Sequence, residues 1–289
     1  MIAAAAVALI AAAPAPAPIK ADAQAWLAAC KGKDGWSDPA PPVRLFANVY
    51  DVGTCGITAV LITGPKGHVL IDGATAEAAP GIAANIRRLG YRLGDVRLIL
   101  SSHEHVDHVG GLAALKRLTG ATMAARADAK AALESGKPDA DDPQTGILPP
   151  FAGVRVDRLV RDGEVLRVGP LALTAHATPG HTGGSTSWSW RSCEGRACRT
   201  IVYADSLSAV SADGYRFSDH PARIAMFRKT FAKVAALPCD MLLTPHPGAS
   251  DFAERLAGAA PMADRTACRR YAGTAAERLD ARLAKEAGA

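Results

Sequence analysis

The sequence lacks the features that would join separate domains or bind a polyanionic partner. Its 289 residues contain no interior Gly/Ser-rich or charged linker, so we expect a single domain over residues 24–289. The formal net charge is only +5, and no run of Lys and Arg occurs. Nucleic acid is therefore not expected as a partner. No heptad pattern or long apolar edge is present either, so we expect a monomer.

No segment is long and apolar enough to cross a bilayer as a helix, which would need about 20 apolar residues. Residues 2–19 are Ala-rich and end in an Ala/Pro repeat. We interpret residues 1–23 as a secretory signal peptide that is cut at small residues, after Ala21-Asp22-Ala23. The basic residues that usually open such a peptide are missing, so either the true start lies upstream or the export prediction is wrong. The expectation is a periplasmic protein without a membrane anchor.

Six cysteines agree with export, because an even number of cysteines in an exported chain favours disulfides, whereas a cytosolic protein would keep buried thiols. None lies in a CxxC pair, and a turn-like spacer separates Cys193 from Cys198, which suits a disulfide across a hairpin. Six cysteines allow many connectivities, and the sequence alone does not choose among them. The pairing that we favour is Cys30 with Cys55, Cys193 with Cys198, and Cys239 with Cys268.

Hydrophobic residues make up 49% of the chain and charged residues 21%, which is enough for a large core. Their spacing predicts an α/β fold in which strands are followed by helices, twice over. The predicted strands cover residues 43–49, 58–63, 68–72, 96–100, 122–125, 154–160, 164–168, 171–175, 187–191, 199–203 and 241–244. The predicted helices cover residues 25–31, 78–89, 110–118, 127–133, 222–236 and 264–286. Two sheets packed back to back, with helices on the outer faces, satisfy this order.

Residues 134–150 show no periodic pattern and predict a long surface loop, of a length that is usually functional or mobile. Gln144 lies in this loop. If the loop overhangs a site, Gln144 is a candidate for contact with substrate; the alternative is an ordinary solvated residue.

The densest cluster of chemically active side chains is residues 103–108, with the sequence His-Glu-His-Val-Asp-His. It follows the apolar run 96–100 and precedes a predicted helix, so it lies on a loop at a strand end. Imidazole and carboxylate are both ligands of zinc. Burying three histidines and an aspartate without a cation would leave many polar groups unsatisfied, so the cluster predicts a metal site.

Three further features also follow predicted strands. His181 lies in a Pro-Gly-His-Thr-Gly turn, His246 in a Thr-Pro-His-Pro-Gly turn, and Asp205 opens Asp-Ser-Leu-Ser. A single histidine is more often a surface or core residue than a ligand, but the cluster at 103–108 makes both histidines candidates for the same site.

The His-x-His-x-Asp-His pattern with two later turn histidines resembles the metallo-β-lactamase superfamily, over about residues 43–250. The segments 178–182, 203–208 and 243–248 are most similar to subclass B3. Other subclasses would have a cysteine at the position of Ser206, and no cysteine lies near it. The resemblance implies a four-layer αβ/βα sandwich with two mostly antiparallel sheets.

The resemblance also implies two Zn²⁺ ions per chain, each with an open position. The first would be bound by His103, His105 and His181, and the second by Asp107, His108 and His246. A hydroxide shared by the two ions would attack the β-lactam carbonyl, and Asp107 would orient it. Ser206 and Ser208 would bind the substrate carboxylate, directly or through water.

The implied activity is hydrolysis of penicillins, cephalosporins and carbapenems, which confers antibiotic resistance. The chief alternative is another hydrolase of the same fold, a lactonase or a glyoxalase II-like thioesterase, in which Asp205 would align with a bridging aspartate. Export and disulfides favour the β-lactamase. Asp205 is then expected to be a supporting residue, because Ser206 and Ser208 fit the β-lactamase pattern. A non-catalytic zinc protein is a further alternative. We expect Glu104 to be a solvated neighbour of the ligands, with electrostatic tuning of the site as the alternative, and Asp72 to be structural.

Overall fold

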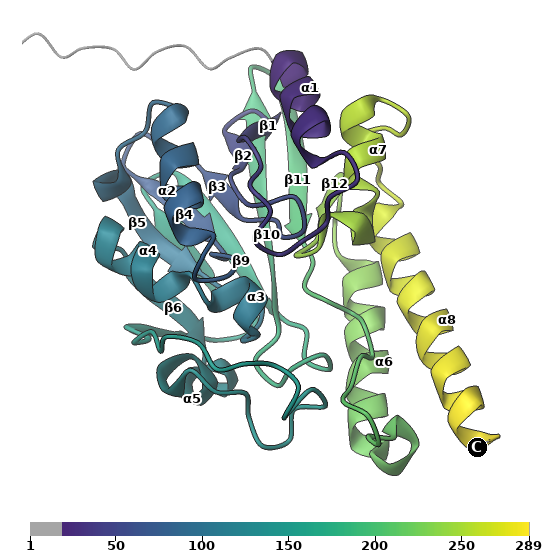
Figure 1. Cartoon of the computed structure of the whole chain (residues 1–289). Coiled ribbons are helices and arrows are strands. Elements are labelled where there is room, and N and C mark those ends of the chain that lie inside the picture. The colour runs from purple at the N-terminus through teal and green to yellow at the C-terminus, as the bar shows by residue number, and fades with distance from the viewer. Residues whose placement is uncertain (1–18, 289) are drawn as a thin grey trace, which may run out of the picture.

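Two β-sheets form the centre of the computed structural model, which describes residues 19–288 (Figure 1). The first sheet has seven strands in the order β1 to β7, and the second has five in the order β12-β11-β10-β9-β8. The predicted two-sheet α/β fold is confirmed.

The seven-stranded sheet is half antiparallel and half parallel. Its strands are β1 (Val43–Phe46), β2 (Val49–Asp51), β3 (Val60–Ile62), β4 (His68–Ile71), β5 (Val96–Leu100), β6 (Thr122–Arg126) and β7 (Arg158–Val160). Strands β1 to β4 pair antiparallel, but β4 to β7 pair parallel. The expectation of a mostly antiparallel sheet is therefore wrong here, because helices separate the later strands and a crossover helix returns the chain to start a parallel strand.

The five-stranded sheet follows the expectation more closely. It contains β8 (Val165–Val168), β9 (Leu171–Ala177), β10 (Thr186–Glu194), β11 (Ala197–Tyr203) and β12 (Met241–Leu243). Only the β11–β12 pair is parallel, since a long helix connects those two strands. The predicted hairpin of β10 and β11 is present, and Cys193 faces Cys198 at its end.

Most of the helices lie on the outer side of one sheet or the other (Figure 1). The helices are α1 (Ile19–Cys30), α2 (Ala79–Arg88), α3 (Val106–Val109), α4 (Leu112–Thr119), α5 (Ala127–Ser135), α6 (Pro221–Ala236), α7 (Phe252–Ala257) and α8 (Ala267–Ala287). Short 3₁₀ turns are η1 (Leu93–Asp95), η2 (Phe217–Asp219) and η3 (Pro247–Ser250). Residues 136–157 contain no helix or strand, so the predicted loop is confirmed, but it also replaces the first part of the strand predicted at 154–160.

Three apolar clusters fill the spaces between four layers. The central cluster joins the two sheets and contains Ile62 and Ile71 from one and Leu173 and Trp188 from the other. A second cluster packs α2 and α4 on the seven-stranded sheet, and a third packs α6 and α8 on the five-stranded sheet. In β4, Val69 and Ile71 enter the central cluster while Leu70 enters the second, so this strand is apolar throughout because both of its faces are buried.

All six cysteines are paired as expected, in Cys30–Cys55, Cys193–Cys198 and Cys239–Cys268. The first disulfide ties the end of α1 to the loop between β2 and β3. The third ties the segment before β12 to the beginning of α8.

Most of the expected signal peptide lies outside the described residues, and its expected cleavage point after Ala23 falls within α1. Export therefore stays a prediction. Across residues 19–288, no helix has the length and apolar character to span a membrane.

Candidate metal centre

The loop after β5 positions the first histidines, and a buried aspartate holds that loop. Asp72 accepts hydrogen bonds from the Ser102 backbone N–H at 2.7 Å, the Ser102 hydroxyl at 2.6 Å and the Tyr203 hydroxyl at 2.7 Å. Because these donors come from both sheets, Asp72 fixes the loop at the point where the sheets meet. This agrees with the structural role predicted for Asp72.

Three buried histidines bring one ring nitrogen each to a common point. The ring atoms of His103, His105 and His181 that can bind a metal lie within 4.8 Å of one another. The opposite nitrogen of each ring donates to an oxygen: His103 Nδ1 to Asp205 Oδ1 at 2.7 Å, His105 Nε2 to Asp142 Oδ2 at 2.8 Å, and His181 Nδ1 to the Ser208 carbonyl at 2.9 Å. Such an outer hydrogen bond is typical of metal-binding histidines, because it fixes the tautomer and the ring orientation.

An unsatisfied buried nitrogen tests whether a cation fits this cluster. His103 Nε2 is buried and has no hydrogen-bond partner among residues 19–288. Leaving a buried polar atom unpaired costs about 1–3 kcal/mol. A metal ion bound by the three inner nitrogens would remove that cost, so the donor set fits a cation.

Asp107, His108 and His246 form a second convergent group. His108 Nε2 lies 3.0 Å from Asp107 Oδ2 and 3.3 Å from His246 Nε2, and the latter lies 3.4 Å from Asp107 Oδ2. Tetrahedral ligands with bonds of about 2.0–2.2 Å would be roughly 3.3–3.6 Å apart. The three atoms therefore have nearly the spacing of ligands to one ion. His103 also lies near this group, and its ring centroid is 4.2 Å from that of His108.

Electrostatics at the second group point to the same conclusion. Burial lowers the pKa of His108, but the adjacent Asp107 carboxylate outweighs burial and raises that pKa to about 10. Burial likewise raises the pKa of Asp107, and the positive charge of His108 outweighs it, so the pKa of Asp107 falls well below its usual range. In the absence of a metal ion, His108 is thus held in its protonated form beside the Asp107 carboxylate, and a bound cation would take the place of that proton.

His246 occupies the accessible side of the site. Its side chain is 42% exposed, whereas His103, His105 and His108 are almost completely buried. Its Nδ1 donates to the Gly56 carbonyl at 3.3 Å, in the loop between β2 and β3. The site is therefore closed from below by the sheets and accessible beside His246.

Glu104 corrects one expectation. It is only 1% exposed, and its carboxylate accepts hydrogen bonds of 2.9 Å from the Thr182 hydroxyl and the Gly184 backbone N–H. Burial raises the pKa of Glu104 to about 8. The prediction of a solvated neighbour is wrong, because Glu104 turns away from His103 and His105 and into the turn that carries His181. It ties two ligand-bearing segments together.

Asp205 lies behind His103 and makes the outer hydrogen bond of that ring. Its other carboxylate oxygen is buried and unpaired among the described residues. This position agrees with the supporting role that the sequence favoured. Asp142, which supports His105 in the same way, was missed; its only signal was a carboxylate in a loop without periodicity.

The predicted substrate-binding residues take two positions. The hydroxyls of Ser206 and Ser208 form a hydrogen bond of 2.9 Å with each other. Both residues line a cavity that His246 also lines. Gln144 is buried, so the alternative of a solvated loop residue is wrong. Its side-chain amide donates to His105 Nδ1 at 3.4 Å. Contact of these three residues with substrate stays a prediction.

Comparisons with known proteins agree with the resemblance that the sequence shows. A family model described as the metallo-beta-lactamase superfamily matches residues 52–193. The solved structure of the metallo-β-lactamase MIM-1 from Novosphingobium pentaromativorans is 52% identical, with a TM-score of 0.89 over 92% of this chain and 98% of that one. MEM-A1, a subclass B3 metallo-β-lactamase from a soil metagenome library, is 49% identical, with a TM-score of 0.84 over 88% of this chain and 99% of that one.

Curated relatives have a different name. The hydroxyacylglutathione hydrolase of Rhodopseudomonas palustris strain BisB18 is 31% identical over 181 residues, which are 61% of this chain and 58% of that protein. The chain thus spans about three fifths of the length of the first curated relatives that it matches. The family model covers the part of the chain that carries residues 103–108.

Proposed function

Since the chain belongs to the metallo-beta-lactamase superfamily, we propose that it is a zinc-dependent hydrolase that opens the β-lactam ring of penicillins, cephalosporins and carbapenems. The observation that carries the proposal is the convergence of two ligand groups at the accessible end of the sandwich, the first of them with an outer hydrogen bond on each of its three histidines. The similarity to solved metallo-β-lactamases, one of them of subclass B3, over almost their whole length supports the choice of substrate.

On this proposal the site holds two Zn²⁺ ions. One would be bound by His103, His105 and His181, and the other by Asp107, His108 and His246. Zinc in such sites lowers the pKa of a bound water to about 7 and polarises a carbonyl group. The supporting groups Asp205, Asp142 and the Ser208 carbonyl keep the three outer imidazole protons away from the centre.

The chain's own side chains would then orient substrate and water. Asp107 turns Oδ2 to the two histidines, while Oδ1 makes no hydrogen bond to the described residues, so Oδ1 is available to accept a hydrogen bond from the attacking water and orient it. Ser206 and Ser208 would donate to the substrate carboxylate at the cavity edge. Gln144 lies near enough to His105 to contact a group at the first zinc.

The thioesterase alternative deserves a direct test because the curated relatives are named hydroxyacylglutathione hydrolases. In that alternative Asp205 would bridge the metals. Here its carboxylate meets His103 on the ring nitrogen opposite the cluster, which supports the β-lactamase. The three disulfides support it further, since glyoxalase chemistry serves a cytosolic thiol pool. They also support export to the periplasm.

The test is a panel of hydrolysis rates on the zinc-loaded protein. Benzylpenicillin, a cephalosporin, a carbapenem and S-lactoylglutathione would be assayed with and without a chelator. We expect chelator-sensitive hydrolysis of all three β-lactams and little thioester hydrolysis. Asp107→Ala should lose β-lactam activity, whereas Asp213→Ala, in an exposed turn, should keep it. Rapid thioester turnover without β-lactam turnover would reverse the proposal in favour of the alternative.

A further inference from the structure

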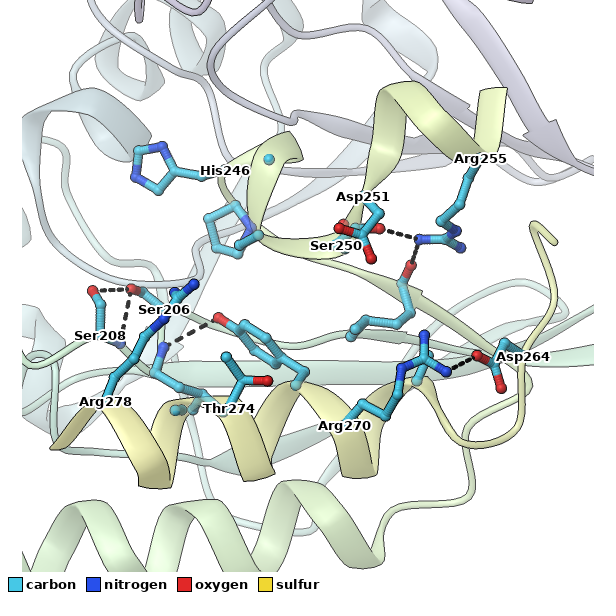
Figure 2. Close-up of a pocket in the computed structure, with 18 of the residues that line it drawn as sticks. Ser206, Ser208, His246, Ser250, Asp251, Arg255, Asp264, Arg270, Thr274 and Arg278 are labelled. Carbon is cyan, nitrogen blue, oxygen red and sulfur yellow. Dashed lines mark hydrogen bonds and ion pairs between the residues drawn. The ribbon is translucent and has the colours of Figure 1, made fainter. Parts of the chain in front are cut away.

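A cavity of about 670 Å³ lies beside the candidate metal centre (Figure 2). Ser206, Ser208 and His246 line one end of it, and α8 forms a long side. Cavities of roughly 300–1,000 Å³ are typical of sites for small molecules. The space is therefore large enough for the part of a substrate that extends away from the metal centre.

One face of α8 lines this cavity. Tyr271, Thr274, Ala275 and Arg278 are spaced three, four and seven residues apart, so they share a face of the helix. The Tyr271 hydroxyl donates to the Asp205 carbonyl at 3.1 Å and accepts from the Leu207 backbone N–H at 3.2 Å. These two groups flank Ser206, so α8 fixes the backbone that presents the Ser206 hydroxyl.

Arg278 differs from the other arginines that line the cavity. Arg255 is buried and donates to three backbone carbonyls, those of Leu242, Ser250 and Met262. Arg270 forms an ion pair with Asp264. Arg278 forms no ion pair or hydrogen bond to any residue between 19 and 288. Of the two carboxylates in the lining, Asp264 is taken by Arg270, and Asp251 lies at the start of α7 near Arg255.

The direction of the Arg278 side chain adds to this contrast. It rises from α8 toward Ser206 and Ser208, at the end of the cavity nearest His246 (Figure 2). A guanidinium group is always charged and binds a carboxylate through two parallel hydrogen bonds. The two serine hydroxyls on the opposite side are neutral, so they orient an anion but do not balance its charge.

We propose that Arg278 and the cavity-lining face of α8 form an anion subsite, in which the carboxylate of a lactam substrate binds between the Arg278 guanidinium and the hydroxyls of Ser206 and Ser208. The inference rests on the proposed function for the identity of the substrate. Arg278 acts in binding only, because it lies on the helix side of the cavity and forms no hydrogen bond or ion pair with any of the six candidate ligands. Its loss should therefore affect the Michaelis constant far more than the turnover number.

Steady-state kinetics on the zinc-loaded protein test the subsite. Arg278→Gln should raise KM for benzylpenicillin by about 5- to 20-fold, with kcat changed less than about 2-fold. The methyl ester of benzylpenicillin, which lacks the carboxylate, should have the same KM in both proteins. Arg269→Gln is the matched control: it removes an exposed arginine nine residues earlier on α8, on the opposite face and outside the cavity lining. An unchanged KM in Arg278→Gln, or equal losses for acid and ester, would overturn the proposal.

A binding measurement separates this inference from the proposed function. Hydrolysed benzylpenicillin, which carries the same carboxylate, would be titrated calorimetrically into the zinc-loaded wild type and both variants. Weaker binding to Arg278→Gln alone supports the subsite even if no variant hydrolyses a β-lactam, in which case only the proposed function fails. Equal binding by all three proteins, or binding by none, refutes the subsite even if β-lactams are hydrolysed.

Discussion

At the scale of single residues, the carboxylates around the site differ by what they touch. Asp107 meets two candidate ligands directly, Asp205 and Asp142 each meet the outer nitrogen of one histidine, and Glu104 joins two backbone segments. The sequence indicated that Asp107 lies among the candidate ligands, because it stands between histidines in the pattern at 103–108. It did not indicate the burial of Glu104 or the support by Asp142, because both depend on turns that are distant in the chain.

Asp205→Ala should weaken the first metal site. The substitution leaves His103 Nδ1 buried without an acceptor, and loss of such a partner typically costs about 10- to 100-fold in metal affinity. Asp205→Asn keeps an acceptor oxygen, so its loss should be smaller. Zinc affinity measured by competition with a chromogenic chelator distinguishes the two variants. If both lose all bound zinc at the first site, Asp205 is itself a ligand, as in the thioesterase alternative.

A pH effect on stability should come from Asp51, which lies far from any candidate ligand in the chain. Asp51 is buried and accepts from the backbone N–H groups of Gly53 and Ala59 at 3.0 and 3.1 Å. Burial raises the pKa of Asp51 to about 7. These hydrogen bonds lower the pKa, but they offset only part of the effect of burial. Because the folded pKa exceeds the unfolded one, the contribution to stability is complete below about pH 4 and is lost as pH rises to about 7.

Asp51→Asn, whose side chain does not titrate, should therefore flatten the dependence of stability on pH between about 4 and 7. Urea unfolding of the wild type and the variant at several pH values in this window measures the effect. Asp213→Asn, in an exposed turn, should keep the slope of the wild type. Parallel slopes for wild type and Asp51→Asn would show that Asp51 is ionised in the folded protein throughout.

At the scale of elements, the loop between β2 and β3 positions His246 although it contains no candidate ligand. Its Gly56 carbonyl accepts from His246 Nδ1, and the Thr58 backbone N–H donates to the Pro245 carbonyl at 2.8 Å. The Cys30–Cys55 disulfide ends one residue before Gly56. A side chain at Gly56 would meet the Asp34 carbonyl oxygen at 2.0 Å, so the loop tolerates only glycine there. The Cys30–Cys55 disulfide thus holds in place the Gly56 carbonyl, which orients His246.

Replacing Cys30 and Cys55 together by serine should release zinc from the second site more than from the first. The change frees the loop that carries the His246 acceptor, while the supports of His103 and His105 lie elsewhere. Zinc content after dialysis against a weak chelator measures the loss. The double variant Cys193→Ser/Cys198→Ser removes a disulfide at the far end of a hairpin and should retain both ions. Equal loss in the two double variants would contradict the role of the loop.

At the scale of the whole molecule, the sequence predicted the two sheets and the two convergent histidine turns, because periodicity and residue type carry that information. The even number of cysteines predicted disulfides, and the pairing that we favoured is the one present, although the sequence alone did not choose it. It did not predict the change from antiparallel to parallel pairing after β4, since pairing direction depends on where the crossover helices pack. Nor did it predict that α8 lines the cavity. The amphipathic pattern shows that a helix is half buried, but not which groups its other face meets.

Removing metal should destabilise the whole fold rather than one loop. The six candidate ligands follow β5, β9 and β12, so they link both sheets. A ligand present at about 1,000 times its dissociation constant stabilises a protein by about 4 kcal/mol, which corresponds to roughly 10 °C in a chain of this size. Calorimetric melting with and without a chelator should show a decrease of this order. His181→Ala should show a smaller one, and an unchanged Tm in the wild type would contradict tight metal binding.

The residues that line the cavity beside the metal centre come from a later part of the sequence than the first group of histidines. The three buried histidines of the first group lie between residues 103 and 181, whereas the cavity lining begins at Ser206 and ends at Arg278. Single-codon changes in the later stretch can therefore alter the charge and shape presented to a drug without disturbing the buried histidines. On the proposed function, selection by new antibiotics could therefore act on α8 without loss of the metal centre, and an inhibitor that depends only on the metal-binding side would be less exposed to such escape.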